Sequence, residues 1–298
     1  MLFKEAIEKF NAWQSFGKRQ STRATYRLNM LQFAMYMRNC AIEMVTLDDI
    51  IGYLQGMRDL GFNENNFMVK SISIKKFFEF FGKLHITRID PELIPIIEGE
   101  YKFPKVADAA DYQKLLNSIP VNNDPRHVRN KTMLMLYKDT GMRLNECISL
   151  DIKDVDTQKM TAMIKTEKTK KLHPIRRIFW TEQTNEQMKL WIAKRGTLLS
   201  KDDALFISAC GPKVGLRITG AGVTEMLRRY SHLAGLGYVL NTHSLRHLFG
   251  RTLAEQGAQD SSIATMMGHA HVDSSRPYTI MAGNKMAEFY DKYMRKPQ

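Results

Sequence analysis

Two short motifs in the second half of the chain combine residue types that could act on a phosphate. The first, TGMRLNE, has a glycine break followed by Arg143 and, three residues later, Glu146. The second, HSLRH, places His243 and Arg246 three residues apart, which is the same edge of a helix. Guanidinium groups match phosphate oxygens in a forked geometry, and an imidazole can exchange a proton at neutral pH. An arginine and a histidine near a helix N-terminus therefore predict a phosphate site.

The residues around HSLRH predict a helix over about 242–256. Thr242 is a suitable N-cap, and Gly257 is a suitable residue just past the C-terminus. Leu245, Phe249 and Leu253 follow at helical spacing, so we expect them to form the buried stripe.

A third motif places Gly268-His269 ahead of a tyrosine, Tyr278, nine residues after His269. The preceding residues predict a short helix over 260–267, with Asp260 as its cap and Gly268 as its end. Its expected apolar side comprises Ile263, Met266 and Met267. His269 should then project from the end of the helix.

Together and in this order, the motifs resemble the tyrosine recombinase (integrase) family, especially its compact Xer-type members. TGMRLNE matches that family's TGxRxxE box, HSLRH its HxxRH box, and MGH with the later tyrosine its LGH…Y box. The 23-residue step from Arg246 to His269 is also typical. The resemblance extends over the whole chain, because the first part looks like a helical core-binding domain and RIDPELIP is similar to its end.

The resemblance implies a role for each matched residue. Tyr278 would attack a DNA phosphate and form a 3′-phosphotyrosyl link. Arg143 and Arg246 would hold the two non-bridging oxygens of that phosphate. His243 would act as an acid/base group, and His269 would donate a hydrogen bond to the phosphate.

The resemblance also implies a structural role for Glu146 and a reaction without cofactors. Glu146 would orient its neighbours and not react. No metal, ATP or other cofactor is expected, since guanidinium groups replace a metal ion and the phosphotyrosyl bond retains the energy of the broken phosphodiester.

The family uses a lysine from a β-turn as the general acid for the departing 5′-oxygen. The corresponding segment here, KTEKTKK over 165–171, departs from the GKGxK form of many Xer proteins. Lys168 is our choice for the acid. The other lysines of the turn remain possible acids and are expected to contact DNA: Lys165, Lys170 and Lys171.

The elements that must position these residues indicate a mainly α-helical protein of two domains. Apolar residues at helical spacing predict an all-helical domain over 1–98, and Gly99 and Pro104 break the pattern in a linker near 96–106. Residues 105–298 predict a mixed α/β domain with a small antiparallel sheet from strands at 161–164 and 175–180. Its helices are expected at 108–118, 128–138, 183–194, 220–234, 242–256 and 260–267.

The charge of the chain favours a polyanionic partner. Its 298 residues include 44 Lys and Arg against 31 Asp and Glu, a net charge of +13. Residues 1–104 hold 14 basic and 12 acidic side chains, and the remainder holds 30 and 19. Double-stranded DNA is the natural partner, because cations on a phosphate backbone release counterions.

The first domain has a basic stretch of its own. Between Glu8 and Glu43 no acidic residue occurs. Four cations there are the expected DNA contacts of this domain: Lys18, Arg19, Arg23 and Arg27. Arg23 and Arg27 lie four residues apart, where like charges repel. Either this helix face is simply solvated, or a DNA backbone outside the fold compensates the two charges.

Several classes are excluded or disfavoured. The chain has no run of about 18 apolar residues, no apolar signal core at its start and only three well-separated cysteines. We therefore expect a reduced, cytoplasmic protein without a membrane partner. Two alternatives share the chemistry or the fold: a type IB topoisomerase-like nicking-closing enzyme, and a DNA-binding protein of the same fold that does not cut.

The expected partner is a short, roughly palindromic DNA site on which four protomers assemble, with a second recombinase or an accessory protein as a further candidate. After Tyr278 the chain continues over 279–298, where apolar residues recur at helical spacing. Such a short helix should dock either on its own domain or, as the resemblance suggests, into a neighbouring protomer.

Overall fold

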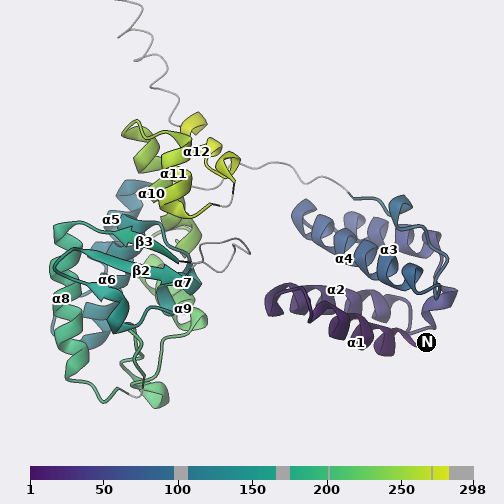
Figure 1. Ribbon diagram of the computed structural model, residues 1–298, viewed down its shortest axis with the longest axis horizontal. Coiled ribbons are helices and arrows are strands. Elements are labelled where there is room, and N and C mark those ends of the chain that lie inside the picture. Colours follow the sequence, from purple (N-terminus) through teal and green to yellow (C-terminus); the bar gives the residue numbers. More distant parts are fainter. Residues whose placement is uncertain (97–106, 166–174, 201, 270, 282–298) are drawn as a thin grey trace, which may run out of the picture. The chain divides into compact units, whose positions relative to one another are not determined.

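The computed structural model describes residues 1–96, 107–165, 175–200, 202–269 and 271–281. The chain divides into two compact units, Met1–Lys102 and Phe103–Gln298 (Figure 1). Within the described residues, no helix is long and apolar enough to cross a membrane.

The first unit is helical throughout its described part. Its four α-helices are α1 (Phe3–Gln14), α2 (Gln20–Tyr36), α3 (Leu47–Asp59) and α4 (Glu64–Lys83). The hydroxyl of Thr46 and the carboxylate of Asp49 form a reciprocal capping box that starts α3. Asn63 is the N-cap of α4, and its side-chain oxygen accepts from the backbone N–H of Asn65.

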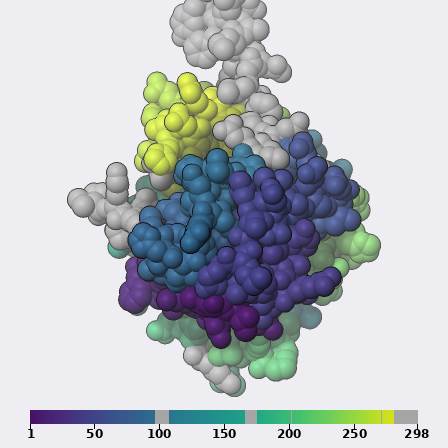
Figure 2. Space-filling view, turned by 90° about the vertical axis from the view of Figure 1, so that its right-hand side faces the viewer, coloured from purple at the N-terminus to yellow at the C-terminus, as the bar shows by residue number. Residues whose placement is uncertain are grey.

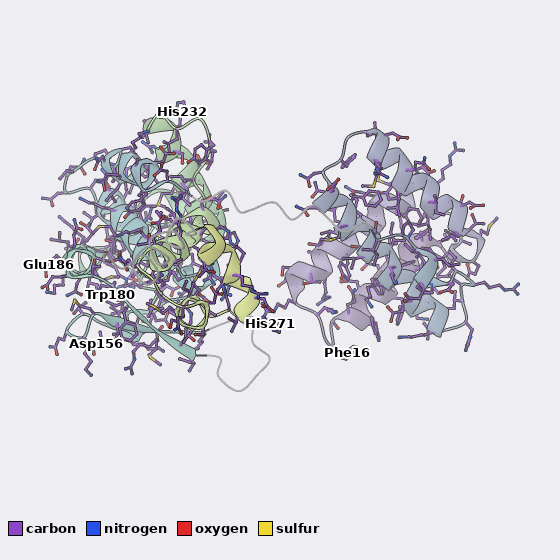
Figure 3. All side chains as sticks on the ribbon, turned by 90° about the horizontal axis from the view of Figure 1, so that it is seen from above. Phe16, Asp156, Trp180, Glu186, His232 and His271 are labelled. Atoms are coloured by element: carbon purple, nitrogen blue, oxygen red, sulfur yellow. The ribbon has the colours of Figure 1, made fainter. Side chains whose placement is uncertain are left out.

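Aromatic rings form the core of the first unit. Six phenylalanines from three helices are almost fully buried there: Phe3, Phe10, Phe33, Phe77, Phe78 and Phe81. The rings of Phe3 and Phe77 stack with centroids 5.7 Å apart, and Phe10 meets Phe77 edge to face. Figure 2 shows the outer surface of this unit in purple to blue. Phe16, just after α1, is 92% exposed and lies at the edge of the unit (Figure 3).

Two arginines of the basic stretch of the first unit, Arg23 and Arg27, have partners within the fold. Arg27 forms an ion pair with Glu8 at 2.7 Å, and the Nε of Arg23 donates to the side-chain oxygen of Asn11 at 3.2 Å. Both partners lie on α1, so the two arginines join α2 to α1. Arg27 keeps nearly half of its side chain exposed.

The second unit combines helices with a small sheet. Strands β1 (Val155–Asp156), β2 (Thr161–Lys165) and β3 (Ile175–Phe179) form an antiparallel sheet in that order. Lys165 pairs with Ile175 at the open end. The main helices before the sheet are α5 (Ala109–Asn117), α6 (Pro125–Thr140) and α7 (Leu144–Ile148). Those after it are α8 (Glu182–Gly196), α9 (Gly220–Leu233), α10 (Thr242–Glu255), α11 (Asp260–Met267) and α12 (Arg276–Met281).

The core of this unit surrounds α6, which packs against both α8 and α10 (Figure 1). From Ala162 onward, burial alternates along β2 with the period of two that a strand requires: Ala162 and Ile164 are buried, and Met163 between them is exposed. Ile178 of β3 is buried as well. A smaller apolar cluster joins α10, α11 and α12 and includes Phe249, Met267 and Tyr278. The fold is therefore mainly α with one small antiparallel sheet, as the sequence predicted.

Three local predictions were wrong by one position or one face. The N-cap of α10 is Asn241, whose side-chain oxygen accepts from the N–H of Ser244, and Thr242 is the first helical residue. Asp260 is likewise the first residue of α11 and not its cap; its carboxylate accepts from the hydroxyl of Thr279. Met266 is exposed on α11, while Ile263 and Met267 are buried.

Candidate active site

Arg143 is the N-cap of α7, directly after the sharp turn that ends α6. Gly141 ends α6 with a φ of 56°, a left-handed conformation that glycine adopts without strain. The guanidinium of Arg143 donates through Nη1 to Glu146 at 2.9 Å and through Nη2 to the carbonyl of Gly268 at 2.9 Å. The second contact joins the first motif to the end of α11.

Arg246 lies on α10 and is buried. Its guanidinium donates to two carbonyl oxygens, that of Gly141 at 2.6 Å and that of Met267 at 2.7 Å. Burial and then the neighbouring charge of Arg143 lower the pKa of Arg246 to about 10, so it remains a cation at neutral pH. The two sequence-predicted arginines thus meet at the C-terminal end of α11.

A third arginine, Arg176 on β3, completes what we call the arginine cluster: Arg143, Arg176 and Arg246. Arg176 donates to Glu146 at 3.0 Å and to the carbonyl of Met266 at 2.6 Å. Burial alone would raise the pKa of Glu146, but Arg176 and the contacts from Arg143 hold it below its ordinary value. Sequence analysis missed Arg176, because nothing in a basic strand distinguishes this residue from its neighbours.

Tyr278 lies on α12 with its side chain directed into the fold and only 3% of its surface exposed. Its hydroxyl lies 2.8 Å from the Nδ1 of His247, a residue of HSLRH to which sequence analysis gave no role. Burial, followed by the charges of His243 and Arg246, lowers the pKa of His247 to about 4. At neutral pH the imidazole is therefore uncharged and can accept a proton.

His269 lies directly after α11, and its Nδ1 is 2.8 Å from the hydroxyl of Ser275. Its ring stacks on that of Tyr278 with centroids 6.4 Å apart. Burial, then the charges of Arg246 and Arg143, lower the pKa of His269 to about 4. His243 lies on the first turn of α10 with an exposed side chain.

The basic turn is only partly described. Lys165 ends β2 with an exposed side chain, whereas Lys168, Lys170 and Lys171 lie outside the described residues. The four expected DNA contacts of the other unit lie just before α2 and along it: Lys18 and Arg19 in the connection from α1, and Arg23 and Arg27 on the helix.

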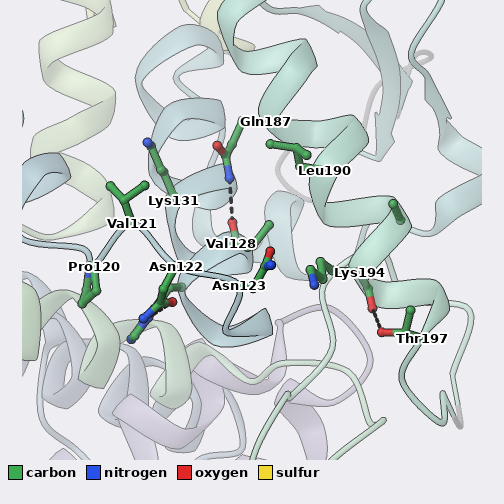
Figure 4. Close-up of a pocket in the computed structure, with 12 residues that line it drawn as sticks. Pro120, Val121, Asn122, Asn123, Val128, Lys131, Gln187, Leu190, Lys194 and Thr197 are labelled. Atoms are coloured by element: carbon green, nitrogen blue, oxygen red, sulfur yellow. Dashed lines mark hydrogen bonds between the residues drawn. The ribbon is translucent and has the colours of Figure 1, made fainter.

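A cavity of about 340 Å³ occurs elsewhere on the second unit (Figure 4). Residues of α6, α8 and the loop at 120–123 line it, and the amide of Gln187 donates to the carbonyl of Val128 across it. It contains no member of the arginine cluster and is too small for a DNA duplex.

Among the described residues, no group of three or more His, Cys, Asp or Glu side chains is placed to hold a metal ion.

The family model of the phage integrase family matches residues 105–284, which include every residue of this site. The chain therefore belongs to the phage integrase family. It is a site-specific tyrosine recombinase of the Xer-like kind, an enzyme that cleaves and rejoins DNA. The comparisons favour this activity over a topoisomerase or a non-cleaving DNA-binding protein.

Similar proteins match along nearly the whole chain. Tyrosine recombinase XerD of Oceanobacillus iheyensis is 27% identical over 286 residues, which cover 93% of each protein. Tyrosine recombinase XerC of Herpetosiphon aurantiacus is 27% identical over 98% of this chain and 95% of its own. A crystal structure of XerH site-specific recombinase bound to palindromic difH substrate has the same fold, with a TM-score of 0.73 and 23% identity over 92% of this chain and 80% of XerH.

Proposed function

We propose that Tyr278 is the nucleophile and that Arg143 and Arg246 bind the phosphate that it attacks. The phenol oxygen forms a bond to phosphorus, the bond to the 5′-oxygen breaks, and the DNA 3′ end stays on the tyrosine. The 5′-hydroxyl departs with a proton from a lysine, and its later attack on the phosphotyrosine reverses the step. The observation that supports these roles is that both arginines, His269 and Tyr278 converge at the end of α11.

The phenol must lose its proton as it attacks, and its usual pKa of about 10 makes this costly at neutral pH. His247 is in hydrogen-bond contact with the hydroxyl and is uncharged at pH 7, so it is a suitable proton acceptor. His243 is the other candidate, on the resemblance. Because Tyr278 is buried, the tyrosine must turn outward before a DNA phosphate can reach it.

The DNA target is, in this proposal, a short and roughly palindromic duplex bound by two protomers, with two such sites brought together in a tetramer. XerH, whose structure is similar, is bound to a palindromic substrate. The terminal segment 284–298 lies outside the described residues, and we propose that it docks between protomers. A head-to-tail contact of this type closes into a ring when the rotation permits.

Trapping the covalent adduct tests this proposal. The full-length protein is incubated with a fragmented library of genomic DNA, denatured, and the DNA that remains attached is sequenced. We expect one short inverted-repeat sequence whose cleaved 3′ end is attached to Tyr278. Mass spectrometry of the DNA-linked peptide identifies the attachment site. Tyr278→Phe should bind the same sequence without an adduct, because only the nucleophilic oxygen is lost. An adduct that persists in Tyr278→Phe would move the nucleophile elsewhere, with Tyr290 and Tyr293 the next candidates.

A further inference from the structure

Arg176 is the member of the arginine cluster with no place in the chemistry described above. It is the second residue of β3, and its side chain is only 12% exposed. Its neighbour Arg177 lies on the opposite face of the strand and is exposed. The strand thus directs one of two adjacent arginines toward the site.

One end of the Arg176 guanidinium holds the carboxylate that orients Arg143. Glu146 is 1% exposed, and both of its oxygens are in use. Oε1 accepts from the guanidinium of Arg143, while Oε2 accepts from the backbone N–H of Arg143 at 2.8 Å and from Arg176 at 3.0 Å. Arg176 is therefore the other cation on the carboxylate that fixes the direction of the Arg143 guanidinium.

The other end of the guanidinium holds the backbone that leads to His269. Three consecutive carbonyls at the end of α11 each accept from a different member of the arginine cluster. Met266 accepts from Arg176, Met267 from Arg246 and Gly268 from Arg143. A shift of any one of these carbonyls would move the other two and the histidine that follows.

The position of Arg176 is not explained by stability alone. Its Nε is buried and has no hydrogen-bond partner among the described residues, which costs free energy. A buried carboxylate with two guanidinium groups is also expensive to desolvate compared with an apolar contact. Such an arrangement is more useful for fixing a geometry than for holding the fold together.

We propose that Arg176 is a positioning residue for DNA cleavage, which acts through Glu146 on Arg143 and through the end of α11 on His269. The proposal rests on the roles given above to Arg143 and His269. Because β3 begins directly after the lysine-bearing segment at 166–174, the same contacts fix the strand that follows the candidate general acids relative to the phosphate-binding arginines.

The test is single-turnover adduct formation on two substrates that differ at the scissile phosphate. One carries the natural phosphodiester, and the other a methylphosphonate, in which a methyl group replaces one charged oxygen. Arg176→Met should slow adduct formation on the phosphodiester by about 10-fold to 100-fold, the usual effect of removing a side chain that holds a reactive group in place. On the methylphosphonate the same variant should lose less of its rate, because this substrate lacks one of the charged oxygens that the arginines stabilise.

Three controls separate positioning from folding. Arg177→Met removes the exposed neighbour and should keep the wild-type rate on both substrates within about twofold. Arg143→Ala should show the same substrate dependence as Arg176→Met, and in the double variant the loss of Arg176 should cost less than it costs in the wild-type protein, because only the route through His269 remains. If Arg176→Met fails to fold, Arg176→Lys serves in its place, since an ammonium retains the charge but cannot bridge Glu146 and the carbonyl of Met266.

Two outcomes would overturn the proposal. One is an equal loss on both substrates, which indicates a general loss of structure. The other is a double variant whose defects multiply, which indicates that Arg176 does not act through Arg143. If the wild-type protein forms no adduct through Tyr278, the proposed function fails instead, so the two failures are distinguishable.

Discussion

The arginine cluster concentrates three cations around one carboxylate, Glu146, in a largely buried place. Arg246 donates to two neutral carbonyl oxygens, which satisfy two of its N–H groups without balancing its charge. A buried charge of this kind is costly unless it is paired. A DNA phosphate would supply the negative charge that the cluster lacks, which is why we expect the arginines to act most strongly when charge builds up on phosphorus.

Replacement of Arg246 by lysine tests whether the forked geometry matters or only the charge. Arg246→Lys should reduce adduct formation by roughly 10²-fold or more, the effect of removing one transition-state donor. The lysine ammonium cannot donate to the carbonyls of Gly141 and Met267 while also facing a phosphate. The rate is measured with saturating DNA, and binding is followed separately. Wild-type activity in Arg246→Lys would show that a point charge suffices.

Substitution of the leaving oxygen by sulfur identifies the general acid among the turn lysines. A thiolate departs without a proton, so loss of the acid should be repaired on a 5′-bridging phosphorothiolate substrate. Lys168→Ala should be slow on the normal substrate and restored on this one. Lys165→Ala, Lys170→Ala and Lys171→Ala provide the matched controls. Selective rescue of one of these three would transfer the role to it.

Two half-buried histidines, His247 and His269, predict how stability depends on pH. The pKa of His247 and that of His269 are both lowered to about 4, against about 6.5 in an unfolded chain. Between these values the unfolded state binds more protons, so stability should fall as the pH decreases from 6.5 towards 4. As the pH decreases over this range, the Tm of His269→Asn should fall less than the Tm of the wild-type protein, because asparagine does not take up a proton on unfolding. A constant difference in Tm between the two proteins would contradict the lowered pKa of His269.

At the scale of elements, the ends of the helices decide where the reactive residues lie. Sequence analysis predicted the helices of the second unit from their apolar spacing, and it placed Gly257 and Gly268 correctly beyond two helix ends. The two N-caps were wrong because Asn241 and Gln259 precede residues that can also cap a helix. Strand β1 was missed, since two residues are too few to show a period.

Contacts between distant residues set the limit of sequence analysis at the site. The motifs supplied Arg143, Arg246, His269 and Tyr278 by resemblance. The roles of Arg176 and His247 depend on which elements pack together: Arg176 contacts a carbonyl 90 residues away, and His247 contacts a tyrosine 31 residues away. No local pattern encodes such distances.

The turn after α6 is the element whose loss should disturb the site most directly. A Cβ at Gly141 would lie 2.3 Å from a ring carbon of Phe249, in addition to the strain of a positive φ. Gly141→Ala should therefore destabilise the protein by at least about 1 kcal/mol from the backbone alone. Its carbonyl also holds Arg246, so cleavage should fall as well. Gly196→Ala, where a Cβ meets nothing within 4 Å, is the control; an unchanged Tm for Gly141→Ala would contradict the tight turn.

At the scale of the whole molecule, the chain consists of two units with separate hydrophobic cores. All residues assigned to the chemistry lie in the second unit, which also carries most of the net positive charge. We expect the first unit to contribute DNA contacts just before and along α2. Two DNA-binding modules on one chain gain affinity because the second contact becomes intramolecular. Separating the two units therefore tests whether cleavage belongs to the second unit and whether the first unit adds DNA affinity.

Separate expression of residues 1–96 and 107–298 should give two folded proteins, each with its own cooperative thermal transition. The 107–298 fragment should still form an adduct through Tyr278 at high DNA concentration, but bind its site more weakly by roughly 10²-fold or more than the full chain. Its affinity should also depend less on salt, because fewer phosphates are neutralised. Adding the 1–96 fragment in trans should not restore affinity, since the link is lost. If the 107–298 fragment instead binds as tightly as the full chain, Lys18, Arg19, Arg23 and Arg27 do not contribute to DNA affinity, and α2 serves only to pack against α1 and α4.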